Sequence, residues 1–285
     1  MITPKDIIDN LINEENEETK ILNEKLEPCE ELKPCEDLEQ CVILSVKHKP
    51  LKHKQVKKML NKYLVEDQRV FEVGVDEVGR GPMFGRVYTA AVILPKDDTF
   101  DFSIPKDSKK FTSKKKILEA SNYIKEHALA WEVSYEDEQK IDEINILQAT
   151  QVSMHKSILK VIDKFKKTSV FKSVENPEIH LLIDGNYFNP IIVLNKNTNK
   201  LESIPHIMIK GGDNKYASIA AASILAKVER DKYIEELCIE DPTLDERYDI
   251  SSNKGYGTKP HMDGINKFGI TKWHRKTFGI CKSFN

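Results

Sequence analysis

The apolar residues of this chain are unevenly distributed, and their pattern changes near residue 66. Before that point, charged and polar residues prevail. Beyond it, Val- and Ile-rich runs bounded by glycines and polar turns predict five strands, at 70–78, 86–94, 128–135, 179–184 and 204–210. Apolar residues at mainly helical spacing predict a helix over 137–165, and an Ala-rich run predicts a buried helix over 214–237. Early strands followed by interleaved helices predict an α/β domain with a mixed sheet.

The first 65 residues form a charged N-terminal extension in two parts. Residues 1–40 hold 4 basic and 13 acidic residues, and residues 41–65 hold 7 lysines and no acid, so the net charge of −2 hides a strong asymmetry. We expect the acidic part to be a flexible tail, with a metal site at Cys29, Cys35 and Cys41 as the alternative. Within the basic part, the run at 47–62 is either a solvated linker or a contact to nucleic-acid phosphates.

The composition excludes several classes of protein. No stretch of about 18 apolar residues is present, so no membrane-spanning helix is predicted. The acidic N-terminus lacks the apolar core of a secretory signal and the arginines of a transit peptide. Five cysteines in 285 residues favour reduced thiols over a disulfide framework. We therefore expect an intracellular protein, cytoplasmic by default, with the nucleus or another compartment left open.

Acidic residues stand where predicted strands end. Asp76 and Glu77 close one strand, Asp184 closes another, and Asp213 follows a third. Because sites in open α/β sheets form where strand ends and the following loops converge, we expect these four carboxylates to lie together. A dense negative cluster is unfavourable without cations, and carboxylate oxygens suit Mg²⁺ or Mn²⁺. Two such ions roughly 4 Å apart activate a water and stabilise the leaving oxygen in phosphodiester cleavage.

Each of these acids also has a purely structural interpretation. Any one of them could be a helix cap or turn former, and Asp213 could be the N-cap of the helix that follows it. Adjacent residues of a regular strand face opposite sides of the sheet. Asp76 and Glu77 therefore reach one site only if the strand ends or bulges there, or if one of them approaches by another path. The glycines that permit a bulge are Gly79, Gly81 and Gly85.

Glycine-rich and basic segments supply groups that suit a polyanion. Gly79 and Gly81 let the backbone approach a ligand closely, and Arg80 adds a phosphate donor. Residues 106–116 carry six lysines and one aspartate, for which an exposed charged face is an equally good interpretation. Near the C-terminus, basic side chains alternate with aromatic rings, which suits phosphate contact and stacking on sugars or bases. These residues are Lys254, Tyr256, Lys259, Lys272, Trp273, His274, Arg275 and Lys276.

Seven ordered blocks make the sequence similar to type 2 ribonucleases H, and specifically to bacterial-type ribonuclease HII. They span nearly all of 71–278 and read GVDEVGRGPMFGRVYTAAVILP, DSKKFTSKKK, IDEINILQAT, LLIDG, IKGGDNKYASIAAASILAKVERD, KGYGTKPH and HRKTF. The resemblance implies an RNase H-like α/β fold, with a mixed five-stranded sheet flanked by helices. It makes 66–285 the catalytic domain, with a helical C-terminal region that helps to bind substrate.

The resemblance also implies an activity and its residues. The family hydrolyses RNA in RNA–DNA hybrids and cuts 5′ of a ribonucleotide embedded in duplex DNA, leaving 5′-phosphate and 3′-hydroxyl ends, as in ribonucleotide and primer removal. Its GRG loop is expected to grip the 2′-hydroxyl, and its tyrosine to pack on the next deoxyribose. Its metal ligands map onto Asp76, Glu77, Asp184 and Asp213. Its substrate-binding residues map onto Gly79, Arg80, Gly81, Lys109, Asn145, Lys210, Tyr256, His274 and Arg275.

Two departures from the family pattern bear on the site. The usual KGD is here Lys210-Gly211-Gly212-Asp213, and the extra glycine could shift Asp213. We prefer Asp213 to Asp231 as the fourth acid because Asp231 lies 18 residues further on, far along the predicted helix. The segment between Asp184 and Asp213 is long and rich in Asn and Lys, which predicts an extended hairpin loop.

The interpretation that we favour is an active endoribonuclease with a two-metal site for Mg²⁺ or Mn²⁺. One rival is a catalytically impaired hybrid-binding protein of the same fold, supported by the extra Gly212. Another is a different two-metal nuclease or strand-transferase of that fold. The expected partners are RNA–DNA hybrid and ribonucleotide-containing duplex DNA. We expect a monomer. A protein partner such as a replication clamp is left open by the sequence.

Overall fold

The structure, a computed structural model, describes residues 59–97, 99–195 and 199–284. The acidic segment 1–40 with its three cysteines and the basic run up to residue 58 lie outside the described residues, so what we expect of them stays a prediction. The last residues of the predicted extension contact the folded domain. The Asn61 N–H donates to the Lys215 carbonyl at 2.8 Å, and the Ala217 N–H donates to the Asn61 carbonyl at 3.0 Å.

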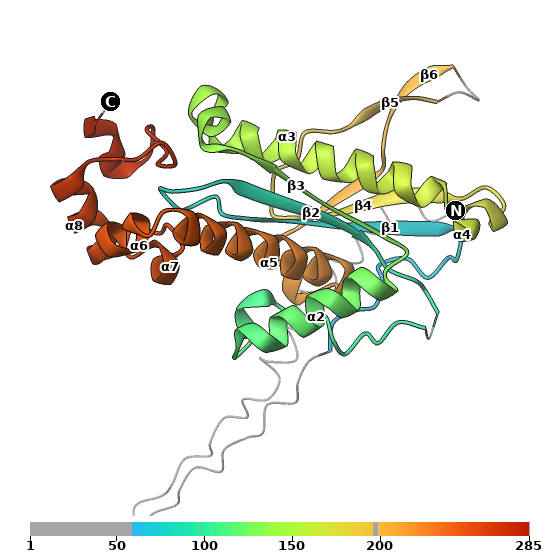
Figure 1. Ribbon diagram of the computed structural model, residues 1–285. Helices are drawn as coiled ribbons and strands as arrows, with labels where there is room; N and C mark the ends of the chain where they lie inside the picture. Colours follow the sequence, from blue (N-terminus) through green and yellow to red (C-terminus); the bar gives the residue numbers. More distant parts are fainter. Residues whose placement is uncertain (1–58, 98, 196–198, 285) are drawn as a thin grey trace, which may run out of the picture. The chain divides into compact units, whose positions relative to one another are not determined.

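The domain is built on a five-stranded mixed sheet (Figure 1). β3, β2 and β1 are antiparallel neighbours, whereas β1, β4 and β7 run parallel. The mixed α/β fold expected from the sequence is confirmed, and all five predicted strands are present. In their order across the sheet, the strands are β3 (Ala130–Glu136), β2 (Val87–Ile93), β1 (Val70–Val78), β4 (Glu178–Asp184) and β7 (His206–Ile209).

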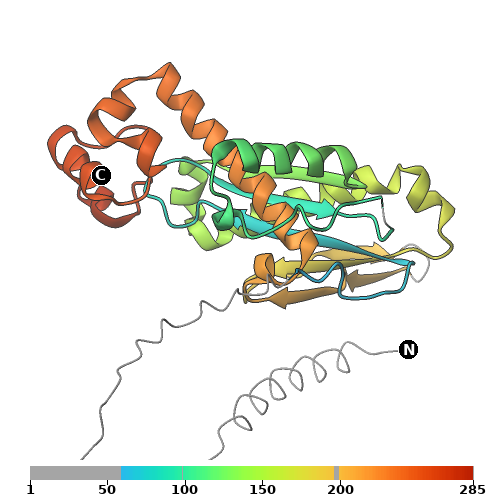
Figure 2. The same ribbon diagram turned by 90° about the horizontal axis from the view of Figure 1, so that it is seen from below.

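Helices cover both faces of the sheet (Figure 1). The long helix α3 (Glu138–Lys166) buries an apolar stripe that includes Met154 and Ile158 against Val73 and Val75 of β1. On the other face, α5 (Ala217–Glu240) and α2 (Lys114–His127) lie side by side (Figure 2). The predicted helix over 137–165 is present but broken at Asn145, whose φ of 68° is not helical. The short helix α4 (Ser169–Ser173) follows α3.

A helical C-terminal region continues from α5, as expected. It contains α6 (Thr243–Tyr248), α7 (Ile250–Asn253), α8 (Lys259–Phe268) and a 3-10 helix, Gly279–Phe284. Between Asp184 and Asp213, the strands β5 (Ile192–Asn195) and β6 (Lys200–Ser203) form the predicted hairpin, which projects from the body (Figure 1). Within the described residues, no helix combines the length and the apolar character needed to span a bilayer.

Helix α5 packs closely against β1, on the side of the strand to which the buried Asp76 points. A Cβ atom on Gly74 would lie 2.2 Å from the Ser218 carbonyl carbon, so this contact requires glycine. Alternate residues of a strand share a face, so Asp76 points to the same side as Gly74, toward α5. There its carboxylate accepts a hydrogen bond from the Ser223 side chain.

Candidate active site

Three parallel strands bring the four predicted acids to one edge of the sheet. Asp76 and Glu77 lie near the end of β1, Asp184 ends β4, and Asp213 lies in a 3-10 helix, Gly212–Asn214, just after β7. Because β1, β4 and β7 are parallel neighbours, their carboxyl ends face the same way. Asp76 and Asp213 are both buried, with 5% and 6% of their surface exposed.

The charge of Asp184 acts on all three of the other acids. Burial raises the pKa of Asp76 well above its usual value, and the charges of Glu77 and Asp184 add to that rise. Burial also raises the pKa of Glu77, with Arg80 opposing the rise and Asp184 adding to it. The pKa of Asp213 is raised by burial and then by Asp184. Three acids therefore carry charge that is poorly compensated by the protein.

Asp76 and Glu77 lie on opposite faces of the sheet. The ladder between β1 and β2 stays regular through Val78, with Asp76 opposite Ala90 and Glu77 opposite Thr89, so no bulge turns the two side chains together. The Glu77 N–H donates to Asp76 Oδ1 at 2.7 Å. The path by which Glu77 would reach the other acids stays a prediction; its carboxylate lies 3.3 Å from Arg80 Nη1.

The extra glycine is part of the turn that carries Asp213. Gly211 has a φ of +64°, which favours glycine, and the Gly212 N–H donates to Asp184 Oδ1 at 2.7 Å. A Cβ atom on Gly212 would lie 2.5 Å from Ile219 Cδ1. The two glycines therefore let the chain turn back toward Asp184 with Asp213 beside it.

The structure contradicts a helix-capping role for Asp213 and gives Asp231 another partner. The N-cap of α5 is Tyr216, so the interpretation of Asp213 as the cap of that helix is wrong. Asp231 lies well along α5 and pairs with Lys227 at 2.6 Å. Asp213, in contrast, directly follows Gly212, whose N–H donates to Asp184 Oδ1 at 2.7 Å.

The glycine-rich loop and the predicted tyrosine lie together. Arg80 and Gly81 are exposed, and Gly79 has a φ of +95°. A Cβ atom on Gly81 would lie 3.5 Å from the Tyr256 ring, which is itself 49% exposed. The loop and an aromatic face thus form one continuous accessible surface.

The other predicted contact residues divide into exposed and buried ones. Lys109, Asn145 and Lys210 are exposed, and Asn145 Oδ1 caps the second part of α3 by accepting from the Gln148 N–H at 3.1 Å. His274 and Arg275 are 1% and 0% exposed. Direct substrate contact by these last two is therefore wrong for the side chains as the structure places them.

The two buried residues hold other parts of the site. The Arg275 guanidinium donates only to backbone carbonyls of the glycine-rich loop and its continuation. His274 Nε2 lies 3.1 Å from His261 Nε2, and His261 Nδ1 lies 2.9 Å from the Tyr256 carbonyl. His274 thus connects the C-terminal segment to the backbone of Tyr256.

Sequence reasoning missed two residues next to the acids. Asp107 raises the pKa of Asp213, and its side chain also accepts from the Lys109 N–H at 2.9 Å. Ser223 hydrogen-bonds Asp76 and lies 3.2 Å from Ser108, joining the lysine-rich segment to α5. The signal for Asp107 was its position as the one acid in a run of six lysines.

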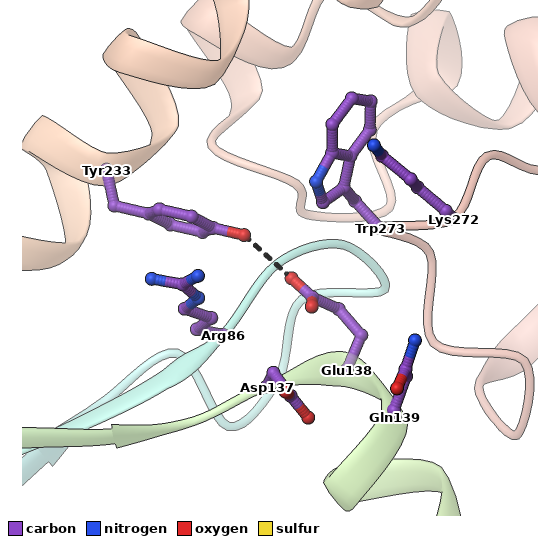
Figure 3. A pocket seen from close by; sticks show the side chains of 7 residues that line it. All are labelled: Arg86, Asp137, Glu138, Gln139, Tyr233, Lys272 and Trp273. Atoms are coloured by element: carbon purple, nitrogen blue, oxygen red, sulfur yellow. Dashed lines mark hydrogen bonds between the residues drawn. The ribbon is translucent and has the colours of Figure 1, made fainter.

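A separate cavity of about 170 Å³ has residues of α3, α5 and the C-terminal region in its wall (Figure 3). In its wall, the Tyr233 hydroxyl donates to Glu138 Oε1 at 2.9 Å, and the Arg86 guanidinium lies 4.3 Å from the Tyr233 ring. The lining residues are Arg86, Asp137, Glu138, Gln139, Tyr233, Lys272 and Trp273. None of the four acids lines this cavity, so the candidate active site is the open sheet edge.

Carboxylates at the ends of three parallel strands, beside a glycine-rich loop, define an RNase H-like protein. A family model described as Ribonuclease HII matches residues 73–281. The chain belongs to the ribonuclease HII family, and the enzyme class expected from the sequence, a type 2 ribonuclease H, is confirmed.

Curated relatives agree with this family, and solved structures share the fold. A ribonuclease HII of Bacteroides thetaiotaomicron is 44% identical over 222 residues, covering 78% of this chain and 95% of the relative. One of Pelagibacter ubique is 44% identical over 205 residues, covering 72% and 94%. The crystal structure of ribonuclease H2 from Pyrococcus horikoshii shares the fold, with a TM-score of 0.50 at 21% identity over 75% of this chain and 96% of that one. The ribonuclease HII in the PCNA complex from Archaeoglobus fulgidus does so too, with a TM-score of 0.50 at 22% identity over 73% and 95%.

Proposed function

We propose that this protein is a divalent-metal-dependent endoribonuclease that cuts the RNA strand of RNA–DNA hybrids. It also cuts 5′ of single ribonucleotides embedded in duplex DNA and leaves 5′-phosphate and 3′-hydroxyl ends. The observation that carries this proposal is the meeting of Asp76, Glu77, Asp184 and Asp213 at one sheet edge, next to an accessible glycine-rich loop. RNA–DNA hybrid and ribonucleotide-containing duplex are its partners, and it acts as a monomer inside the cell.

The acids suit Mg²⁺ or Mn²⁺ by their donor chemistry and their charge. Hard carboxylate oxygens are the ligands that these ions take. Burial, and then the neighbouring carboxylates, raise the pKa values of Asp76, Glu77 and Asp213, and bound cations would offset both effects. Ions held there would supply Lewis acidity to the attacking water and to the leaving oxygen. Within the described residues, no three Asp, Glu, His or Cys side chains already surround one ion position, so the ligand arrangement itself belongs to the proposal.

The protein residues around the acids orient the metal ligands and the substrate. The Gly212 N–H fixes one oxygen of Asp184, and Ser223 fixes the Asp76 carboxylate, which leaves their remaining oxygens for ligation. The glycine-rich loop of Gly79, Arg80 and Gly81 reads the 2′-hydroxyl. Tyr256, in contact range of Gly81, packs on the next deoxyribose, so one surface reads the RNA-to-DNA junction.

Three exposed residues extend the contact to the flanking phosphates. Lys109, whose charge acts on Asp213, and Lys210 are exposed and offer positive charge, and Asn145 offers its side-chain amide at the break in α3. The impaired-binder alternative depended on Gly212 displacing Asp213. Because Gly212 is built into the turn beside Asp184, that support is removed.

A cleavage assay on an RNA–DNA hybrid tests the proposal. The protein is incubated with the hybrid and with Mg²⁺ or Mn²⁺, and the Asp76→Asn variant is the matched control. We expect metal-dependent cutting by the wild type and none by the variant, with both proteins folded. Binding of hybrid without cutting by the wild type would favour the impaired binder instead.

A further inference from the structure

The backbone carbonyls of the glycine-rich loop are turned into the protein by one buried side chain. Arg275 Nη2 donates to the Gly79 carbonyl at 2.6 Å, and Nη1 donates to the Arg80 carbonyl at 3.0 Å. The same guanidinium donates to the carbonyls of Pro82 at 2.7 Å and Gly85 at 2.8 Å. A planar fork of donors thus holds four carbonyls of one short loop.

A second buried arginine completes this arrangement. Arg230, 1% exposed, donates to the carbonyls of Phe84 and Arg86, each at 3.3 Å. The Arg275 backbone N–H donates to the Met83 carbonyl at 2.8 Å. A Cβ atom on Gly79 would lie 2.4 Å from Arg230 Nε, so glycine is needed where the loop meets this arginine.

Neither guanidinium is neutralised by an acid. In the part of the chain that the structure describes, Arg230 and Arg275 form no ion pair with Asp or Glu. Backbone carbonyl dipoles stabilise their positive charges instead. Burying an arginine without a carboxylate is costly, and leaving it without its hydrogen bonds would cost more. The loop conformation and the two side chains therefore require each other.

The carbonyl directions determine where the amides point. In a trans peptide, the C=O of one residue and the N–H of the next point in opposite directions, and the described residues contain no cis peptide. Because the Gly79 and Arg80 carbonyls face Arg275, the N–H groups of Arg80 and Gly81 face away from it. Both residues are exposed, and neither N–H has an acceptor among the described residues.

We propose that Arg275, assisted by Arg230, is a positioning residue that determines ribonucleotide specificity by turning the Arg80 and Gly81 amides outward to the 2′-hydroxyl. This inference rests on the proposed function. Arg275 does not touch the substrate; it acts through the loop. The lysine side chain has one nitrogen, whereas the arginine guanidinium has three that donate here. Arg275→Lys therefore keeps the positive charge but loses most of the hydrogen bonds to the loop carbonyls.

Paired binding measurements test the role of Arg275. Two duplexes that differ only by one ribonucleotide are bound to the full-length protein in the Asp76→Asn background with Mg²⁺, and fluorescence anisotropy gives both Kd values. We expect Arg275→Lys to lower the preference for the ribonucleotide duplex by about tenfold, since outward donors are lost, while the Kd for all-DNA duplex changes little. Arg230→Lys, which frees carbonyls further from the two amides, should have a smaller effect.

Controls separate positioning from general damage. Arg247→Lys removes an exposed arginine of α6 and should leave the preference intact. Thermal melts confirm that each variant is folded; if Arg275→Lys does not fold, Arg230→Lys carries the test and should still lower the preference. A folded Arg275→Lys variant that keeps the wild-type preference would overturn the inference. Failure of the wild type itself to cut a ribonucleotide-containing duplex would instead overturn the proposed function.

Discussion

Acid should destabilise this protein partly through one buried histidine pair. His274 and His261 are 1% and 0% exposed, and their Nε2 atoms lie 3.1 Å apart. The Thr271 N–H donates to His274 Nδ1, so His274 is neutral and donates from Nε2 to His261. The rings of Phe84 and Tyr248 enclose His274 at 5.1 and 5.2 Å. Among the described residues, no acid pairs with His274 to compensate a proton there.

The size of the effect follows from the shift in pKa. Burial, and then the neighbouring His261, lowers the pKa of His274 to about 3 from the usual 6.5. The unfolded chain therefore takes up the proton first as the pH falls below 6.5, and stability is lost over the window from 6.5 down to about 3. Between pH 7 and pH 5, this one group should cost about 2 kcal/mol of unfolding free energy.

Urea unfolding at the two pH values measures this loss. Raised acid pKa values at the active site act in the opposite direction, so the comparison is between wild type and His274→Gln, in which those acids are unchanged. The wild type should lose about 2 kcal/mol more than the variant on going to pH 5. The exposed His127→Gln replacement is the matched control and should behave as the wild type does. An equal loss in wild type and His274→Gln would refute the reasoning.

Three further perturbations test the packing and the site. Asp76→Asn should abolish cutting and raise the thermal midpoint without metal, because it removes a buried, poorly compensated charge; a lowered midpoint in a calorimetric scan would contradict this. Gly74→Ala should cost about 3 kcal/mol in urea unfolding, since its Cβ would meet the α5 backbone. A cost below 1 kcal/mol would show that α5 moves easily. Tyr256→Ala should lower kcat/KM on a single-ribonucleotide duplex by about tenfold, with Tyr256→Phe close to wild type; steady-state kinetics in which both variants match the wild type would remove the stacking role.

The strands and the acids at their ends could be predicted because the signals are local. A Val-rich run bounded by glycine predicted β1, and an Ile- and Leu-containing run that stops at Asp184-Gly185 predicted β4. Parallel pairing then brought the ends of these two strands together. The alternation of a strand also indicated correctly that Asp76 and Glu77 face opposite sides. What the sequence did not indicate was that the ladder stays regular through Val78 and that the Glu77 carboxylate contacts Arg80.

The buried arginines could not be predicted from the sequence. Arg275 lies in a basic and aromatic run, where an exposed phosphate contact is the usual interpretation. Its actual acceptors are carbonyls of the 79–85 loop, far away along the chain, and no local pattern indicates them. The break in α3 was missed for a related reason, because the apolar spacing continues through Asn145 while its backbone leaves the helical region.

The position of the cut in a duplex with one ribonucleotide tests the central claim most directly. The strand that contains the ribonucleotide is labelled at its 5′ end, incubated with the full-length protein and Mg²⁺ or Mn²⁺, and resolved to single-nucleotide length. We predict one labelled product that ends just before the ribonucleotide and carries a 3′-hydroxyl that a DNA polymerase extends. A cut on the 3′ side of the ribonucleotide, or no cut with either ion by folded protein, would contradict the account.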